Sequence, residues 1–280
     1  MNEPANPSQA RPDTGAALRG LYEPQGGVRA IFGAKTADYV ASRPDYPQAL
    51  FDALAQECAL PAQARIADIG AGTGLLTQGL LARGWAACAI EPSAEMRAAC
   101  DAQLGGQPGY CSAAGSAETI PLPDASLDLI TAAQAFHWFE PQAARAEMLR
   151  VLKPGGQVAL IWNDRQSEQA LQCALNDEVF GPFGGERRNA LLAHEDRGQV
   201  GAFFGSTAPR EWSWPHQHAL DAGGLRSLVF SRSYMPRPDS EAGRAAAAAV
   251  DALFQRFASG GQVLLHYTTV LMLGRLAAYA

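Results

Sequence analysis

The sequence has 280 residues, of which 48% are hydrophobic and 18% charged, so we predict one globular domain with a substantial core rather than a disordered chain. Its formal net charge is −6, which leaves no basic stripe for a nucleic-acid backbone and disfavours a polyanionic substrate. A small-molecule partner is the first expectation.

The predicted elements begin after a segment without a regular pattern. Residues 1–30 are rich in Pro, Gly, Ala and Gln and lack a helical or alternating period, so we expect a flexible tail. From residue 46 the chain alternates helical blocks with apolar strand blocks. Helices are predicted over 46–58, 75–84, 93–105 and 141–152, and strands over 64–70, 86–93, 127–136 and 157–163. Continuous apolar strands separated by helices favour a parallel sheet covered on both faces.

The turn after the first predicted strand carries Gly70, Gly72 and Gly74 at alternate positions. The first two permit positive φ and a close approach of backbone to ligand, and Gly74 lets the next helix start tight against the sheet. Parallel sheets bind ligands at the carboxyl ends of their strands, and this first turn is the usual place. A purely structural turn is the alternative explanation.

Glu91 ends the second predicted strand, about 20 residues beyond Gly70. A carboxylate at this distance is placed to accept both hydroxyl groups of a ribose, and a solvated loop acid is the alternative. The dinucleotide fingerprint would need a glycine where Leu75 stands. An adenosine-bearing ligand without pyrophosphate therefore fits better than NAD.

Beyond residue 164 the pattern is weaker. A strand near residues 210–220 places Trp212, Trp214, His216 and His218 on one side. Two histidines at this spacing are metal ligands only with further partners, and since no third ligand is evident we predict no metal site. An amphipathic helix over 239–259 and a β-branched strand over 261–276 close the chain.

The five cysteines are odd in number and form no CxxC pair, so their spacing indicates neither a disulfide framework nor a zinc site. No stretch of about 18 uncharged apolar residues occurs, and the N-terminus lacks a basic start followed by an apolar block. We therefore expect a cytoplasmic protein without a membrane partner.

Four stretches, in order, resemble the motifs of class I S-adenosylmethionine-dependent methyltransferases: ADIGAGTGLLT, AIEPSAEM, GSAETIPLPDASLDLITAAQAFHWF and RVLKPGGQVALIWN. The resemblance covers about residues 31–164 and points to methyltransferase type 11, in its UbiE-like or trans-aconitate-methyltransferase-like small-molecule subgroup. It implies an α/β fold: a Rossmann-like, seven-stranded, mostly parallel sheet with an antiparallel last strand, helices on both faces and an N-terminal lid helix.

The resemblance also implies an organisation of the chain. We expect residues 31–280 to form a single domain, with a lid over 31–48 and an insertion over about 165–208 that shapes the substrate pocket. The enzyme would transfer a methyl group from S-adenosyl-L-methionine to a small organic acceptor, leaving S-adenosyl-L-homocysteine. A non-catalytic cofactor-binding or regulatory module and, with less support, a NAD-dependent oxidoreductase are the alternatives.

By position, the resemblance implies a set of cofactor-binding residues. The methionine part would lie over the glycine turn, the ribose on Glu91, and the adenine between Met96 or its neighbour Pro92 and the Ala117 loop. Asp68 would accept the ammonium group or brace the turn, and Met96 fits a core position equally well. The expected set is Asp68, Gly70, Ala71, Gly72, Glu91, Pro92, Met96, Ser116, Ala117 and Gln134.

Upstream, Tyr39 and Arg43 are four residues apart and so share a helical face. They resemble the lid of this subfamily, in which an arginine pairs with the cofactor carboxylate and a tyrosine covers the methyl-donor region. A surface helix is the alternative. We count both among the cofactor-binding residues.

The acceptor side is expected around His137 and Trp138. Methyl transfer from a sulfonium is an in-line displacement, so alignment and exclusion of water supply most of the rate and a general base is optional. His137 is the candidate base, and a histidine that merely orients its loop is the alternative. Ser233 and Tyr234 belong to a Ser-x-Ser-Tyr segment that lies near the substrate opening in relatives, so they are candidate acceptor contacts.

Overall fold

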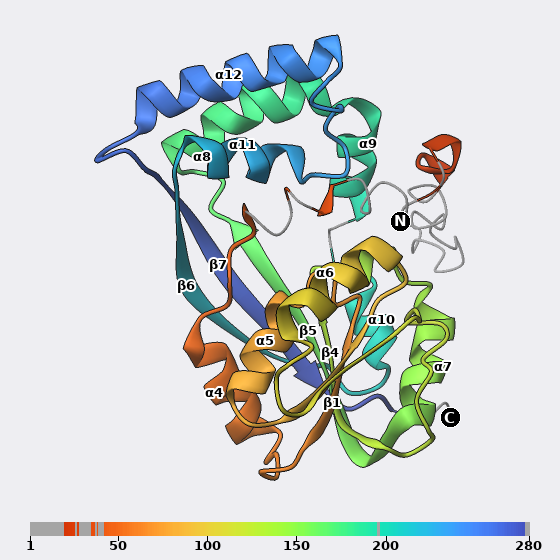
Figure 1. Ribbon diagram of the computed structural model, residues 1–280. Helices are drawn as coiled ribbons and strands as arrows, with labels where there is room; N and C mark the ends of the chain where they lie inside the picture. The colour runs from red at the N-terminus through yellow and green to blue at the C-terminus, as the bar shows by residue number, and fades with distance from the viewer. Residues whose placement is uncertain are drawn as a thin grey trace, which may run out of the picture.

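One seven-stranded sheet forms the centre of the molecule, in a computed structural model that describes residues 20–25, 27, 35, 36, 38, 42–194 and 197–277. The strand order is β3-β2-β1-β4-β5-β7-β6 (Figure 1). Strands β1 to β5 pair in parallel, and β7 runs antiparallel to both β5 and β6. The bounds are Arg65–Ile69 (β1), Ala86–Ile90 (β2), Tyr110–Ala113 (β3), Leu127–Ala133 (β4), Leu152–Arg165 (β5), Arg210–Leu220 (β6) and Val263–Gly274 (β7). The predicted Rossmann-like fold is confirmed.

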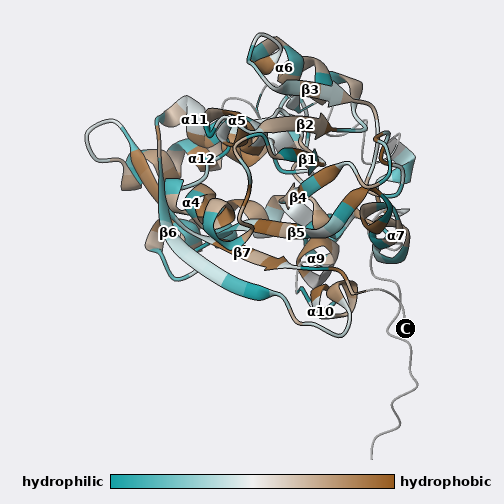
Figure 2. Cartoon of the chain, turned by 90° about the horizontal axis from the view of Figure 1, so that it is seen from below, coloured by the Kyte–Doolittle hydropathy of each residue, from teal (hydrophilic) through white to brown (hydrophobic). Residues whose placement is uncertain are grey.

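Helices cover both faces of the sheet. The buried side chains of α4, α5 and α6 join one apolar cluster with residues of β1, β2 and β4, and those of α7 and α10 join another on the opposite face. Figure 2 shows the apolar central strands between these helices and the more polar edge strand β6. The bounds are Gln48–Glu57 (α4), Leu75–Ala82 (α5), Ala94–Leu104 (α6), Pro141–Val151 (α7) and Val200–Phe204 (α10).

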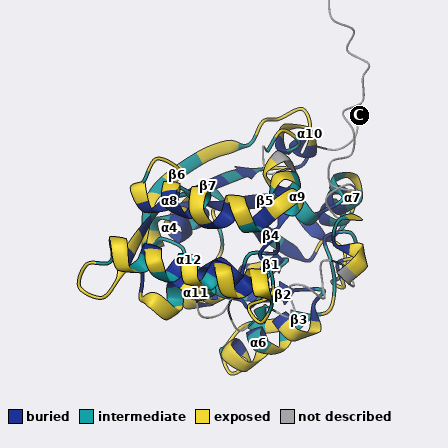
Figure 3. Cartoon of the chain, turned by 90° about the horizontal axis from the view of Figure 1, so that it is seen from above, coloured by how far each residue is buried: buried dark blue, intermediate teal, exposed yellow. Residues whose placement is uncertain are grey.

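A further helical layer lies over the carboxyl ends of the parallel strands (Figure 1). Its outer surfaces are exposed, as seen from above in Figure 3, and its inner side chains form a third apolar cluster with the start of β7. The elements are Ala170–Leu175 (α8), the π-helical Asn176–Phe180 (η3), Gly181–His194 (α9), Ala222–Phe230 (α11) and Glu241–Phe257 (α12). None of the described helices is long and apolar enough to cross a membrane.

Local sequence signals explain where the helices begin. Ser93 caps α6, since its hydroxyl oxygen accepts the backbone N–H of Met96 at 3.3 Å. Pro141 is the first residue of α7, where its missing N–H costs no hydrogen bond. Gly74 precedes α5 with φ +87°, and a Cβ there would lie 2.7 Å from Leu104 Cδ1. The tight helix start that the sequence predicts at Gly74 is present, with α6 as the neighbour.

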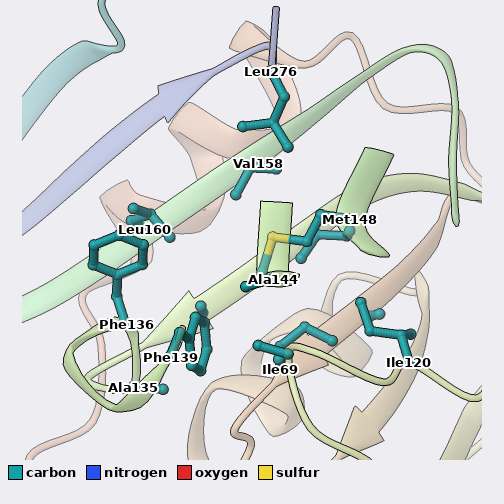
Figure 4. Packing of buried hydrophobic residues seen from close by; sticks show 14 of the residues in the cluster. Ile69, Ile120, Ala135, Phe136, Phe139, Ala144, Met148, Val158, Leu160 and Leu276 are labelled. Atoms are coloured by element: carbon teal, nitrogen blue, oxygen red, sulfur yellow. The ribbon is translucent and has the colours of Figure 1, made fainter. Parts of the chain in front are cut away.

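The apolar cluster on the α7 face fixes the loop that follows β4. Phe136, in the short 3-10 helix η2 (Phe136–Trp138), packs edge-on against Phe139 and Phe203, with ring centroids 6.0 and 4.9 Å apart. Figure 4 shows Phe136 and Phe139 beside Leu160, with Met148 of α7 nearby. Aromatic pairs of this geometry stabilise beyond their area burial, so the loop carrying His137 is anchored on both sides.

Two sequence expectations were wrong. Strand β3 was not among the predicted strands, because it has four residues and none of them is fully buried, so it presents no apolar run. Cys88 and Cys111 form a disulfide although they are separated by 23 residues. Their pairing follows from the register of β2 against β3, which spacing alone does not reveal.

The expected flexible tail over 1–30 lies largely outside the described residues. Within it, Tyr22 is fully buried and packs edge-on against Trp138, with ring centroids 5.6 Å apart. This residue is therefore part of the folded core, since its large aromatic side chain fills a site that the surrounding sequence composition does not signal.

Candidate functional site

The glycine turn at the carboxyl end of β1 is shaped for close approach. Gly70 has φ +69° and Gly72 φ +58°, in the left-handed region that favours glycine. A Cβ on Gly70 would lie 2.7 Å from the Cβ of Ala135, so any side chain would fill the space between β1 and the loop after β4. The backbone is thus the surface that a ligand meets here.

Glu91 ties this turn to the start of α6. Its Oε2 accepts the backbone N–H of Gly72 at 2.9 Å, and its Oε1 accepts that of Ser93 at 2.9 Å. The residue is only 8% exposed, so the alternative of a solvated loop acid is wrong. Glu91 also lines the main cavity, so the group that holds the turn is within reach of a ligand.

A cavity of about 180 Å³ runs along the carboxyl ends of the strands. Most of the sequence-predicted residues line it, although they come from separate turns and loops. A smaller adjoining cavity contains Asp68 and Ala71 and shares Arg43, Gly70 and Gln134 with the first. The predicted residues in the main cavity are Arg43, Gly70, Gly72, Glu91, Pro92, Met96, Ser116, Ala117, Gln134, His137, Trp138, Ser233 and Tyr234.

Met96 and Ala117 are apolar residues of the main cavity wall. Met96 is 2% exposed, so it belongs both to the core and to the cavity wall. The backbone groups of Ser116 and Thr119 exchange hydrogen bonds of 3.1 and 3.2 Å, which makes a tight turn that holds Ala117 at the cavity. A flat aromatic ligand fits between a thioether and such a turn.

Asp68 braces the sheet beneath the turn. Its Oδ2 accepts from the Thr77 hydroxyl at 2.7 Å and its Oδ1 from the Thr131 hydroxyl at 2.9 Å, which links β1 to α5 and β4. Burial raises the pKa of Asp68 to about 6, against the lowering effect of these hydrogen bonds. The bracing role that the sequence left open is therefore present, and the group titrates close to neutrality.

The predicted lid, residues 31–48, is described only in part. Tyr39 lies outside the described residues, whereas Arg43 lines both cavities and its Nη2 donates to the Ser231 carbonyl at 3.3 Å. Lys35, which the sequence analysis did not single out, donates through Nζ to the carbonyls of Phe230, Arg232 and Met235 at 2.9, 2.6 and 3.0 Å. Burial lowers the pKa of Lys35 to about 8. Lys35 and Arg43 thus attach the described part of this segment to the end of α11 and the loop after it.

The centre and far end of the main cavity combine polar and aromatic side chains. Gln134 has φ +55°, and its Nε2 donates to the Asn163 carbonyl at 3.1 Å, so it is held against β5. The ring of His137 lies 4.9 Å from that of Trp138. Ser233 Oγ lies 3.0 Å from the Tyr22 hydroxyl, and Tyr234 packs edge-on against Phe180. Each of these side chains lines the cavity, and each is also held in place by contacts with other protein groups.

Comparison with known proteins identifies the family. Residues 67–160 match the family described as a methyltransferase domain. An uncharacterized methyltransferase of Mycobacterium tuberculosis is 37% identical over 204 residues, which span 72% of this chain and 76% of that protein. The chain belongs to the class I methyltransferase family.

Solved structures share the fold of this methyltransferase. A proposed type II methyltransferase from Anaeromyxobacter dehalogenans has a TM-score of 0.54 at 23% identity, covering 85% of this chain and 99% of that one. A phosphoethanolamine N-methyltransferase of Haemonchus contortus, solved with S-adenosylhomocysteine and phosphomonomethylethanolamine, has a TM-score of 0.52 at 13% identity, covering 93% and 60%. Both likenesses support the fold described above.

Sequence reasoning missed several residues that line the main cavity, among them Glu118 and Arg232. Arg232 is partly buried, with a buried Nε, and lines both cavities, next to the predicted Ser233. Burial and the neighbouring charges of Arg43 and Arg165 hold its pKa down to about 10. Nothing in the sequence around Arg232 distinguishes it from a surface arginine, because its burial depends on the packing of the lid and α11 over the sheet.

The two histidines of β6 have structural partners in the methyltransferase. His216 Nε2 lies 2.9 Å from Asp45 Oδ1, and His218 Nε2 lies 3.1 Å from the Ser42 carbonyl. Both therefore contact the predicted lid segment, residues 31–48. Across the part of the chain that the structure describes, no group of three or more metal-ligating side chains occurs.

Proposed function

We propose that this methyltransferase uses S-adenosyl-L-methionine to methylate a small organic acceptor by in-line displacement, and that it falls in the UbiE-like or trans-aconitate-methyltransferase-like subgroup. The observation that carries the proposal is the buried Glu91 carboxylate, held by two backbone N–H groups beside a side-chain-free turn. A ribose needs such an acceptor, and the methionine part of the cofactor needs such a turn. The residues present fit the cofactor.

Different residues of the chain would then bind different parts of the cofactor. Glu91 would hold the ribose, Met96 with Pro92 and Ala117 would enclose the adenine, and the turn from Gly70 to Gly72 would cradle the methionine part. The cofactor supplies a methyl group already activated on a positively charged sulfur. The protein's task is therefore to align the acceptor and exclude water, which the helical layer above the cavity supports.

The remaining assignments concern the lid and the acceptor. Arg43 would pair with the cofactor carboxylate and Tyr39 would cover the donor region. Trp138, Ser233 and Tyr234 would contact the acceptor, and His137 would accept a proton only if the acceptor atom must lose one. The single-domain organisation over 31–280, the pocket-shaping insertion and the cytoplasmic location also stay predictions.

Product formation tests the proposed function. The purified protein would be incubated with S-adenosylmethionine carrying a labelled methyl group and with fractions of a small-molecule extract. Acceptor-dependent accumulation of S-adenosylhomocysteine, with the label in a second small molecule, is expected. Tight cofactor binding without any transfer would instead favour the non-catalytic module.

His137 is tested on the same reaction once an acceptor is identified. With His137→Gln we expect turnover to fall at least tenfold, with cofactor affinity unchanged. Full turnover in this variant would remove the proposed base and leave His137 as a loop-orienting residue.

A further inference from the structure

Four side chains on one face of the edge strand β6 hold the chain before and within α4. Trp212 and Trp214 pack against the apolar cluster that contains the buried residues of α4. His216 and His218 continue the same face and contact the segment that leads into α4. We call this segment, residues 42–46, the Arg43 segment. No residue of β6, all of which the structure describes, lines either cavity of the site.

The Arg43 segment forms part of the wall of the smaller cavity. Arg43, Pro44 and Tyr46 line this cavity beside the glycine turn, and Arg43 also lines the main cavity. The Nη2 atom of Arg43 lies 3.3 Å from the Ser231 carbonyl oxygen, which is long for an N–H···O hydrogen bond. The position of the guanidinium therefore depends also on how the backbone on either side of Arg43 is held.

His218 holds the backbone on one side of Arg43. Its Nε2 lies 3.1 Å from the carbonyl oxygen of Ser42, a residue that is 1% exposed. A carbonyl oxygen only accepts, so the imidazole donates through Nε2–H and the contact fixes this tautomer. Burial lowers the pKa of His218, so the ring is neutral at neutral pH. The bond is thus a neutral one that is shielded from water.

The backbone on the other side of Arg43 is held at Asp45. His216 Nε2 lies 2.9 Å from Asp45 Oδ1, which allows an ion pair with the protonated ring but lacks hydrogen-bond geometry. Asn163 of β5 donates through Nδ2 to the Asp45 carbonyl at 3.1 Å, and its own carbonyl accepts from Gln134 Nε2 at 3.1 Å. Both sides of Arg43 are therefore attached to the sheet, one of them through a residue that contacts the cavity side chain Gln134.

We propose that His216 and His218 are positioning residues, which hold the Arg43 segment from outside the site so that Arg43 meets the cofactor in a fixed place. This inference rests on the proposed function, in which Arg43 pairs with the cofactor carboxylate. Anchoring the backbone before binding reduces the conformational entropy that is lost on binding, and this raises affinity without any added contact to the ligand. The contribution of His218 is the larger, because only its contact has hydrogen-bond geometry.

The first experiment measures the mobility of the Arg43 segment in the protein without cofactor. Backbone ¹⁵N relaxation gives order parameters for Arg43, Asp45 and Tyr46. We expect rigid values of about 0.85 in the wild type, a fall below about 0.6 in His218→Leu, and values near those of the wild type in His218→Gln, which keeps an N–H donor. Unchanged order parameters in His218→Leu would overturn the proposal.

His266→Gln is the matched control for both experiments. His266 of β7 lies opposite Gln217 in the pairing with β6, and so projects from the other face of the sheet than His216 and His218. The variant replaces a histidine of the neighbouring strand without touching the Arg43 segment. It should change neither the order parameters nor cofactor affinity, and a loss as large as that of His218→Leu would contradict a specific role of the two histidines.

The second experiment is a double-mutant cycle on S-adenosylhomocysteine affinity, measured by calorimetry. We expect His218→Leu to weaken binding about tenfold, His216→Leu about threefold and His218→Gln less than threefold. Because positioning acts through Arg43, His218→Leu added to Arg43→Met should weaken binding less than twofold further. The full tenfold loss on both backgrounds would show that His218 does not act through Arg43, and would contradict the proposal.

Urea denaturation of each variant separates positioning from a general loss of structure. If His218→Leu does not fold, His218→Asn takes its place, because an asparagine amide stays polar but is too short to reach the Ser42 carbonyl. A rigid Arg43 segment in His218→Asn would then overturn the proposal. If the wild-type protein binds no S-adenosylhomocysteine, the proposed function fails, whereas the order parameters still decide whether the two histidines hold the Arg43 segment.

Discussion

The two ends of the cavity differ in how their polar groups are satisfied. At the Glu91 end, both carboxylate oxygens accept hydrogen bonds from backbone N–H groups. The glycine turn there packs closely against neighbouring residues. At the Arg232 end, the Nε of Arg232 and the hydroxyl of Tyr267 are buried without partners in the described protein. A preorganised end suits a ligand that every member of a cofactor-using family shares, and an unsatisfied end suits a ligand that completes the site on binding.

This contrast makes a general prediction about mutations. Changes at the Glu91 end should reduce stability and cofactor binding together, because the same groups hold the fold and face the ligand. Changes at the Arg232 end should leave stability intact or improve it while weakening ligand binding. The following variants test the contrast, from the largest expected effect to the smallest.

Glu91→Ala should have the largest effect. We expect S-adenosylmethionine affinity to fall more than a hundredfold, and the free energy of unfolding to fall by about 3 kcal/mol, since two backbone N–H groups lose a charged acceptor. Calorimetry and urea denaturation measure the two quantities. Glu211→Ala, at an exposed position of β6, is the control. Cofactor affinity that survives Glu91→Ala would show that the ribose is not bound there.

Gly74→Ala tests the close packing of the turn. Gly74 and Gly84 both have positive φ, at +87° and +79°, but a Cβ meets Leu104 at 2.7 Å only at Gly74 and meets nothing within 4 Å at Gly84. We expect Gly74→Ala to lower the free energy of unfolding by about 3 kcal/mol and Gly84→Ala by about 1 kcal/mol. Equal losses in chemical denaturation would mean that backbone strain, and not packing, makes Gly74 necessary.

Asp68→Asn should change how stability depends on pH. The pKa of Asp68 is about 6 when folded, above its ordinary value of 3.8, so the folded state keeps a proton that the unfolded chain has released between these values. The stabilising contribution of Asp68 is therefore full below pH 3.8 and is lost as the pH rises through 6. Relative to wild type, Asp68→Asn should gain on the order of 3 kcal/mol between pH 4 and 7. A difference that stays constant with pH would contradict the raised pKa.

Tyr267→Phe should have the smallest effect on stability. Its hydroxyl is buried without a described partner, so its removal should change the free energy of unfolding by less than about 1 kcal/mol, with a gain as the expected sign. Tyr110→Phe is the matched comparison, because the Tyr110 hydroxyl donates to Asp101 Oδ1 at 2.7 Å and its loss should destabilise by about 1 kcal/mol. A larger loss at Tyr267 than at Tyr110 would contradict the assignment of an unsatisfied hydroxyl to Tyr267.

The sequence predicted the parts of the molecule that depend on local pattern. The apolar runs located β1, β2, β4 and β5, and the glycine turn with Glu91 located the preorganised end of the cavity. Strand β3 was not predicted, because its four residues are not buried and carry no periodic signal. The Cys88–Cys111 disulfide was not predicted, because it depends on the register between β2 and β3.

The Arg232 end of the cavity could not be predicted from the local sequence pattern. Arg232 and Tyr267 belong to separate parts of the chain, and each is ordinary in its own sequence neighbourhood. Their significance arises only when the loop after α11 is packed over the ends of β5 and β7. Groups that are incomplete without a ligand leave no trace in helical or strand periodicity, because periodicity reports how a chain packs against itself.

The central claim is that the preorganised end of the cavity is an S-adenosylmethionine site. Parallel calorimetric titration of the purified protein with S-adenosylmethionine, S-adenosylhomocysteine and NAD tests it most directly. We predict saturable binding of the first two and none of NAD. Binding of NAD alone, or of none of the three, would contradict the account.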